Sequence, residues 1–330
     1  MSNLTQKQFI QDIKDLLQSA RTQTYQAINQ VMTKTYLEIG KKIVEKEQKG
    51  KSRASYGKEL LKNLSIELTK EYGKGFSVTN LKNMRQFYLS FQNRQTLSDD
   101  FKLSYSHYIF LSKIENRDER DFYEIESINN NWSLRELKRQ FDSAIFERLA
   151  LSKDKQKVKE LATKGEIIQK PKDLIKEPYV LEFLGLEEKS HYSENEFEQK
   201  LIDKLEHFLL ELGKGFTFVA RQKRFSFDDE HFRVDLVFYN RILRCFVLID
   251  LKIGKLKHQD VGQMMMYVNY FDRFEKTKEE NPTIGIILCK DKNETLVELT
   301  LPKDSQIFAS KYQTVLPNKE ELKKLLENNQ

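Results

Sequence analysis

The chain has 330 residues, of which 39% are hydrophobic and 32% are charged, and its net charge is +6. This length and composition are typical of a globular protein with room for two domains, and no stretch approaches the roughly 18 apolar residues of a membrane span. The beginning of the chain lacks the basic-then-apolar pattern of a signal peptide, so we expect a cytoplasmic protein. The mildly basic charge is compatible with nucleic-acid binding and equally with an ordinary solvated surface.

Two residue types exclude further classes of site. Cys245 and Cys289 are the only cysteines, and both lie in apolar, strand-like runs, which favours buried free thiols over a disulfide framework. The five histidines are scattered without paired metal-ligand spacing. We therefore expect no zinc site.

Residues 1–150 are predicted to form a helical N-terminal domain, because apolar residues recur there at helical spacing. Within it, Gly73 and Gly75 end one helix and Ser77 or Thr79 begins the next, which is the pattern of a helix-turn-helix element. The second helix of this pair is polar, as a helix that reads a DNA groove would be. An ordinary helical bundle with a solvated face explains the same pattern. The candidate nucleic-acid contacts on this helix are Lys82, Asn83 and Arg85.

Residues 151–180 are lysine-rich and contain the first prolines of the chain, so we expect a linker there. Residues 181–330 are predicted to form an α/β domain with a mixed sheet, which makes the whole chain α+β. Its first element is one long helix from Ser193 to Gly213. Two later strands are expected to meet at a tight Asn240–Arg241 turn.

An acid and a base interrupt the most apolar of these strands. Asp250 and Lys252 are two residues apart, so their side chains point to the same face, and the preceding strand carries Asp235 among apolar neighbours. Unpaired charges are costly inside a core, and two nearby carboxylates raise each other's pKa. A hard divalent cation removes this repulsion, and carboxylates with a backbone carbonyl are the ligands that Mg²⁺ prefers. Lys252 can then position or deprotonate an attacking water and stabilise charge on a phosphate.

The helix after this strand carries a second polar pair. Gln263 and Tyr267 are four residues apart and share a helix face, where they can orient Lys252 or contact a phosphate. Arg221 and Gln222, on the first strand, are candidates for lining a nucleic-acid cleft, although an edge strand explains them equally well.

This arrangement of Asp235, Asp250-x-Lys252 and Gln263-x-x-x-Tyr267 resembles the PD-(D/E)xK nuclease superfamily. The resemblance is closest to YhcG-like proteins, through "VDLVFYNRILRCFVLIDLKIG" and "GQMMMYVNY" in the C-terminal half and "NLKNMRQFY" and "NWSLRELKRQFDSAIFERL" in the N-terminal half. It covers nearly the whole chain and implies a restriction-endonuclease-like C-terminal domain.

The resemblance also implies a set of metal ligands. Mg²⁺, or Mn²⁺ in its place, would be held by Asp235, Asp250 and the carbonyl of Leu251. Such families add a glutamate from the helix before the first strand; Glu198 is the choice here and Glu206 the alternative. The sequence departs from the family pattern in two ways, since no proline precedes Asp235 and Asp250 stands where these relatives most often have glutamate.

The leading hypothesis is therefore a Mg²⁺-dependent nuclease that hydrolyses phosphodiester bonds, in DNA before RNA, with a role in defence, restriction or mobile-element biology. The alternative is a catalytically silent nuclease fold that binds DNA or a protein partner. A homodimer is compatible with either hypothesis.

Overall fold

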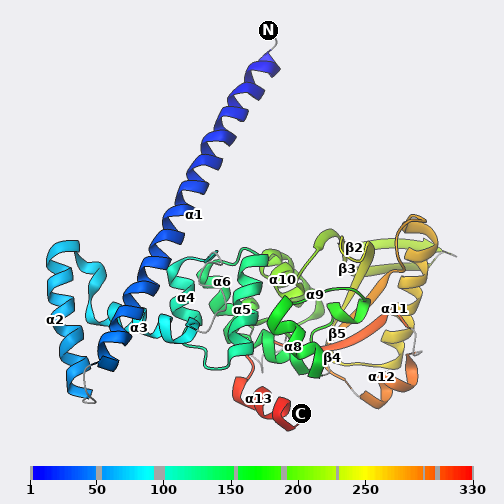
Figure 1. Ribbon diagram of the computed structural model, residues 1–330. Helices are drawn as coiled ribbons and strands as arrows, with labels where there is room; N and C mark the ends of the chain where they lie inside the picture. Colours follow the sequence, from blue (N-terminus) through cyan, green and yellow to red (C-terminus); the bar gives the residue numbers. More distant parts are fainter. Residues whose placement is uncertain are drawn as a thin grey trace. The chain divides into compact units, whose positions relative to one another are not determined.

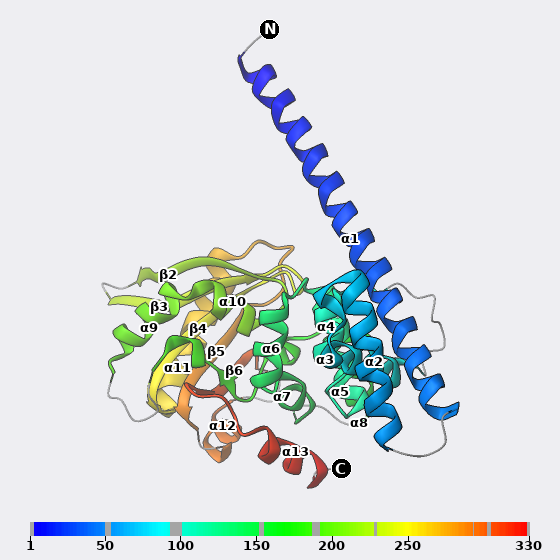
Figure 2. The same cartoon turned by 90° about the vertical axis from the view of Figure 1, so that its left-hand side faces the viewer.

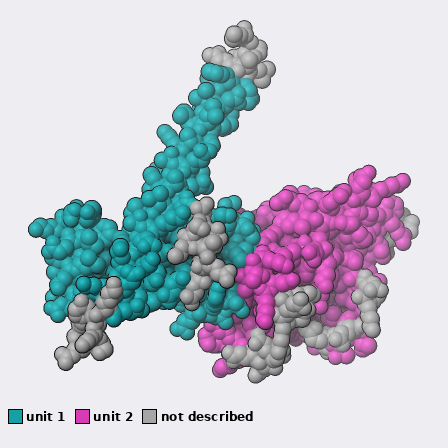
Figure 3. All heavy atoms as spheres, in the orientation of Figure 1, with its two compact units in different colours: residues 1–138 teal, residues 139–330 magenta. Residues whose placement is uncertain are grey.

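The computed structural model describes residues 3–49, 54–92, 101–151, 155–186, 192–227, 230–292, 294–301 and 305–328. The chain divides into two compact units, residues 1–138 and residues 139–330 (Figure 3). None of the described helices is both long and apolar enough to cross a membrane.

Unit 1 is helical in its described residues, as the apolar spacing predicts. The helices are α1 (Asn3–Lys49), α2 (Ala54–Tyr72), α3 (Val78–Phe91), α4 (Tyr105–Leu111), α5 (Arg117–Asn129) and the start of α6 (Leu134–Asp142). A short 3₁₀ turn, η1 (Lys74–Phe76), joins α2 to α3, and the Ser77 side chain caps α3 by accepting a hydrogen bond from the amide of Asn80.

The second half of α1 lies against α3, and this contact forms one apolar cluster of unit 1. Ile43 of α1 is buried with Leu81 and Met84 of α3. The backbones approach so closely at Gly40 that a Cβ there would lie 2.1 Å from the carbonyl oxygen of Met84. Glycine is therefore required at this position, despite its low helix propensity.

The described residues of unit 2 form one six-stranded mixed sheet, in the order β1-β6-β5-β4-β3-β2. Strands β2, β3 and β4 pair antiparallel, whereas β4, β5, β6 and β1 pair parallel. The strands are β1 (Tyr179–Val180), β2 (Phe216–Phe227), β3 (Glu230–Asn240), β4 (Cys245–Lys255), β5 (Ile284–Asp291) and β6 (Ile307–Gln313). The predicted mixed sheet is thus confirmed.

Helices cover both faces of this sheet (Figures 1 and 2). The helices of unit 2 are α7 (Ile145–Leu151), α8 (Lys155–Lys164), α9 (Glu194–Asp203), α10 (Leu205–Leu212), α11 (His258–Tyr270), α12 (Glu294–Thr300) and α13 (Lys319–Asn328). On one face, α9 and α10 bury Phe197 and Phe208 against alternate residues of β4. On the other face, α11 lies so close to β5 that a Cβ on Gly285 would meet the Met264 side chain at 2.6 Å.

Two local expectations were wrong. The predicted single helix after Ser193 is broken at Lys204, whose φ of −118° and ψ of 30° leave the helical range. The break lets both halves place their apolar residues in the same core. The β3–β4 connection is a turn of four residues, 241–244, because the Asn240 side chain accepts hydrogen bonds from the amides of Ile242 and Leu243.

The residues from 151 to 180, expected to act as a linker, supply charge and apolar surface to the core of unit 2. Lys176 and Tyr179 are buried there, and the Lys176 ammonium donates to the backbone oxygen of Glu211. The Glu211 carboxylate pairs with Arg148 at 2.7 Å, and both side chains are fully buried. Burial alone would raise the pKa of Glu211, but the charges of Arg148 and Lys176 outweigh it and hold that pKa below its ordinary value.

Removing Arg148 from this ion pair should leave the buried Glu211 carboxylate without its closest counter-charge. We expect Arg148→Met to lower the free energy of unfolding by about 3–5 kcal/mol, measured by urea denaturation. Glu160→Gln is the matched control, because it removes an exposed partner of Lys164 and should be nearly neutral. Equal effects of the two substitutions would contradict the structural role given to Arg148.

Candidate active site

Two aspartates face each other where β3 and β4 part. The antiparallel pairing of these strands runs from Asn240↔Cys245 to Leu236↔Ile249, and the next pair in this register would be Asp235 with Asp250. There the ladder ends, and Oδ2 of Asp235 instead accepts a hydrogen bond from the backbone amide of Leu251 at 2.9 Å. The end of the ladder places both carboxylates at one point of the sheet.

Asp250 is the more deeply buried of the two, with 3% of its surface exposed. Burial and the nearby charge of Asp235 raise its pKa to about 7, although Lys252 acts in the opposite direction. The pKa of Asp235 is also raised, chiefly by burial. At neutral pH the pair therefore holds less negative charge than two free aspartates.

Lys252 lies beside this pair, with its Nζ 2.8 Å from Oδ2 of Asp250. Burial lowers the pKa of Lys252, but the charge of Asp250 and the contact with it outweigh burial, so this pKa stands above its ordinary value. Lys252 is accordingly a fixed positive charge at neutral pH. A phosphate oxygen placed here would meet an ammonium group held by the protein.

Helix α9 brings a third carboxylate to the site. Glu198 is 3% exposed, and it accepts hydrogen bonds from the Arg221 guanidinium and from the side-chain amide of Gln222. The same amide of Gln222 donates to Oδ1 of Asp235 at 3.1 Å. Gln222 therefore links Glu198 to Asp235. The alternative glutamate, Glu206, lies on the next helix with an exposed side chain.

The backbone of β2 has an unusual conformation at Gln222, the residue that links Glu198 to Asp235. Gln222 has a φ of +48°, which costs energy in any residue other than glycine, and the β2–β3 register shifts between Phe218 and Ala220. Sequence reasoning placed Arg221 and Gln222 among nucleic-acid contacts and gave them no part in the carboxylate cluster. No signal in the residues themselves marks the positive φ that turns Gln222 toward Glu198.

Helix α11 carries Tyr267 and Gln263 and covers the face of the sheet to which Asp250 belongs. Tyr267 is 1% exposed, and its hydroxyl accepts a hydrogen bond from the Gln263 side chain. Burial, and then the charge of Asp250, raise the pKa of Tyr267 to about 12. The phenol is therefore neutral and can donate a hydrogen bond toward the acidic centre.

The carboxylates supply the oxygen ligands that a magnesium site uses, but their present spacing is wider than that of a metal-binding group. Among the described residues, no three His, Cys, Asp or Glu side chains have the spacing of a metal-binding group. The donors nevertheless fit a hard cation, because all are oxygens in a buried setting. Oδ2 of Asp250, apart from its contact with Lys252, receives no hydrogen bond within the described parts of the chain. The Gln222 side-chain amide donates to both Glu198 and Asp235. A cation would therefore also be favoured at the position between these two carboxylates that the amide occupies.

The candidates in unit 1 differ among themselves. Lys82 is exposed on α3 and Asn83 is half-buried, whereas the Nε of Arg85 lies 2.6 Å from the Glu47 carboxylate of α1. Arg85 is therefore engaged in holding α1 to α3. Lys82 retains a free surface position for contact with a phosphate.

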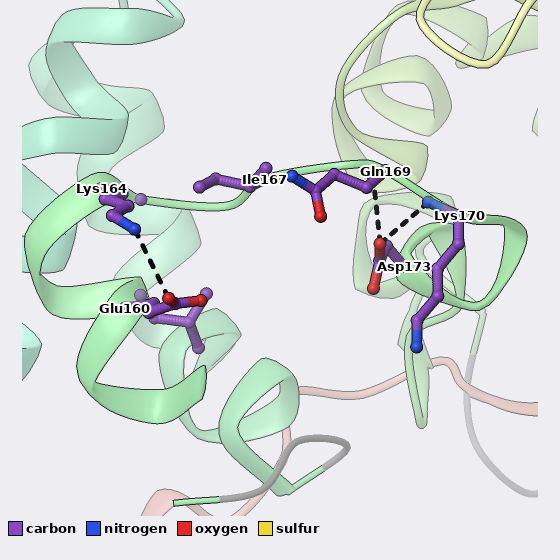
Figure 4. Close-up of a pocket in the computed structure, with 8 residues that line it drawn as sticks. Glu160, Lys164, Ile167, Gln169, Lys170 and Asp173 are labelled. Carbon is purple, nitrogen blue, oxygen red and sulfur yellow. Dashed lines mark hydrogen bonds and ion pairs between the residues drawn. The ribbon is translucent and has the colours of Figure 1, made fainter. Parts of the chain in front are cut away.

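A pocket of about 270 Å³ lies elsewhere, along the segment after α8 (Figure 4). Its polar groups serve the local fold, because Lys164 pairs with Glu160 at 3.4 Å and Asp173 accepts hydrogen bonds from the amides of Gln169 and Lys170. It contains none of the residues that surround Asp235 and Asp250.

Comparison with solved structures gives only distant likenesses. A repair endonuclease from Pyrococcus abyssi is 19% identical with a TM-score of 0.27, over 38% of this chain and 50% of that one. A structure of an EndoMS–dsDNA2 complex is 16% identical with a TM-score of 0.27, over 40% of this chain and 50% of that one. This chain thus matches about half of each.

Comparison of sequences is more informative. Residues 12–148 match the family described as DUF1016 N-terminal domain, and residues 172–327 match the family described as YhcG PDDEXK nuclease domain. A protein of Escherichia coli (strain K12) named "Putative nuclease YhcG" is 41% identical over 338 residues, which cover 93% of this chain and 90% of that protein. Together with the acidic centre on β3 and β4, these matches show that the chain belongs to the YhcG family of PD-(D/E)xK nucleases.

Proposed function

We propose that this chain hydrolyses phosphodiester bonds in DNA and depends on Mg²⁺, with Mn²⁺ as a substitute. The observation that carries the proposal is the facing pair Asp235 and Asp250 with Lys252 beside it, buried at the point where two strands part. A purely structural sheet has no reason to bury two acids opposite each other.

The residues that would hold the metal are Asp235, Asp250, Glu198 and the carbonyl of Leu251. When bound, the metal would neutralise the carboxylates and polarise the phosphate and the attacking water. Lys252 would stabilise the charge that develops on the phosphate, since its pKa is held above the ordinary value and it keeps its proton. Tyr267 and Gln263 would orient the phosphate or Lys252 from α11.

Binding of Glu198 to a metal would require a rearrangement at β2. Its carboxylate is now satisfied by Arg221 and Gln222, so a bound cation would replace these contacts. Arg221, once released, would be available for a phosphate, which would reconcile its place in the site with a role in binding DNA. Lys82 and Asn83 would add contacts from the N-terminal domain, and Arg85 would join them only on leaving Glu47. The net charge of +6 favours a polyanionic substrate.

Cleavage of labelled substrates tests the proposal first. Duplex DNA, single-stranded DNA, branched DNA and RNA would be incubated with Mg²⁺ or Mn²⁺ and the wild-type protein, Asp250→Ala or Lys252→Ala. We expect DNA cleavage by wild type, no cleavage by Asp250→Ala, and a rate on the order of 100-fold lower for Lys252→Ala. If wild type and Asp250→Ala bind DNA equally and neither cleaves it, the chain is a silent binding module.

The choice between the two glutamates has its own test. Glu198→Gln should weaken Mn²⁺ binding, measured by titration calorimetry, because it removes a ligand charge from a buried site. Glu206→Gln makes the same chemical change at an exposed position and should leave Mn²⁺ affinity unchanged. The reverse pattern would transfer the ligand role to Glu206.

The raised pKa of Asp250 predicts a particular dependence on pH. Because its folded pKa of about 7 exceeds its ordinary value of 3.8, the protonated carboxyl stabilises the metal-free fold at low pH. That stabilisation is lost as the pH rises through 7. Each tenfold change in proton affinity corresponds to about 1.4 kcal/mol, so metal-free Asp250→Asn should melt higher than wild type at pH 8 and differ less at pH 5.

Metal should compete with this proton. Mn²⁺ affinity of the wild type should fall between pH 8 and pH 6, and the melting temperature should rise with Mn²⁺ in wild type but not in Asp250→Asn. An equal response to Mn²⁺ in the two proteins would remove Asp250 from the ligand set.

A further inference from the structure

The first part of α1 has a large apolar surface with no partner in the described residues. Every residue from Lys7 to Asn29 is exposed, and burial against the rest of unit 1 begins at Thr33. In Figures 1 and 2 this part of α1 extends beyond the other helices of unit 1. The large hydrophobic side chains exposed on it are Phe9, Ile10, Ile13, Leu16, Leu17, Tyr25, Ile28, Val31 and Met32.

The spacing of the apolar and small residues on this segment is that of a coiled-coil seam. Residues 10, 13, 17, 20, 24, 27 and 31 follow one another at alternating intervals of three and four, and they are Ile10, Ile13, Leu17, Ala20, Thr24, Ala27 and Val31. A single helix in water gains little from its own hydrogen bonds and is stabilised mainly by packing of its apolar face. The seam therefore requires a second helix.

The charge of the segment argues against a polyanionic partner. Over residues 3–32 the acids Asp12 and Asp15 stand against the bases Lys7, Lys14 and Arg21, so the net charge is only +1. Helices that lie on anionic membranes or on nucleic acid carry an excess of Lys and Arg. A protein helix fits this surface better.

The order of large and small residues along the seam points to a second copy of the same helix. Ile10, Ile13 and Leu17 fill the first half, and Ala20, Thr24 and Ala27 fill the second. Two copies running antiparallel place Ile10 against Ala27, Ile13 against Thr24 and Leu17 against Ala20, and the two-fold axis repeats each pair. In these three layers a large residue meets a small one, as close packing requires, whereas a parallel pair would set large against large.

This pairing also matches the length of the exposed segment. In the same register residue 3 of one copy lies level with residue 34 of the other, which is where burial within unit 1 begins. The paired segment is about 30 residues long on each copy, and its seam with the flanking positions would form the interface. The unfavourable feature is that Lys14 of one copy lies near Arg21 of the other, an exposed pair of like charges that salt screens.

We propose that residues 3–32 form an antiparallel coiled coil with the same residues of a second copy of this chain. The pairing is independent of the nuclease centre, so its test needs neither metal nor DNA. It makes the protein a dimer through its N-terminal helix.

Sedimentation equilibrium of the full chain is the first measurement. We expect a dimer for wild type that strengthens with salt, and a dissociation constant at least about 30-fold higher for Leu17→Asp. The matched control is Gln18→Asp, which adds the same charge one residue away on the outer face and should remain dimeric. Circular dichroism would show that both variants keep the helices of the rest of the chain, with any loss of helix in Leu17→Asp confined to an amount that residues 3–32 account for. A monomeric wild type, or equal association of Leu17→Asp and wild type, overturns the proposal.

Cysteine cross-linking tests the direction of the helices. The native Cys245 and Cys289 are buried, so an introduced cysteine is the reactive one. A mixture of Ile10→Cys and Ala27→Cys chains should form disulfide-linked heterodimers, while Ile10→Cys alone should not, because 17 residues of helix separate its two copies by about 25 Å. Efficient cross-linking of Ile10→Cys alone overturns the antiparallel arrangement.

Discussion

Repulsion between two buried carboxylates is the constraint on which the centre of unit 2 depends. Asp235 and Asp250 are held opposite each other by the register of β3 and β4, and neither can move away without breaking the sheet. The fold compensates with a proton on Asp250 near neutral pH, with Lys252, and with donors from Leu251 and Gln222. Each of these compensations offsets part of the repulsion, and this is the physical basis for the proposed cation at the site.

The family and the fold could be predicted from the sequence because their signals are local. Alternation along a strand identifies Asp250 and Lys252 as neighbours on one face, and the apolar strand before them identifies Asp235 as out of place. The helical spacing of Gln263 and Tyr267 predicted that they share one face of a helix, and the structure adds a hydrogen bond between their side chains. Such patterns depend only on the spacing of residues within one strand or one helix, so they can be recognised without knowing the tertiary structure.

The remaining features depend on tertiary geometry that no short pattern encodes. The link from Glu198 to Asp235 requires a positive φ at Gln222 together with a register shift earlier in β2. The break at Lys204 follows from the shape of the core and not from a glycine or proline. The polar composition of segment 151–180 favours a linker and cannot reveal that Lys176 is buried and donates a hydrogen bond to the backbone oxygen of Glu211, 35 residues later.

The burial of Arg148 against Glu211 has a consequence for how this protein evolves. Arg148 is the last residue matched by the N-terminal family, whereas Glu211 belongs to the nuclease family, and yet the two share one interior. Recombination between relatives that exchanged only residues 172–327 would separate the two residues of this buried ion pair. Viable exchanges should therefore join upstream of Arg139, and the two family segments should be inherited together.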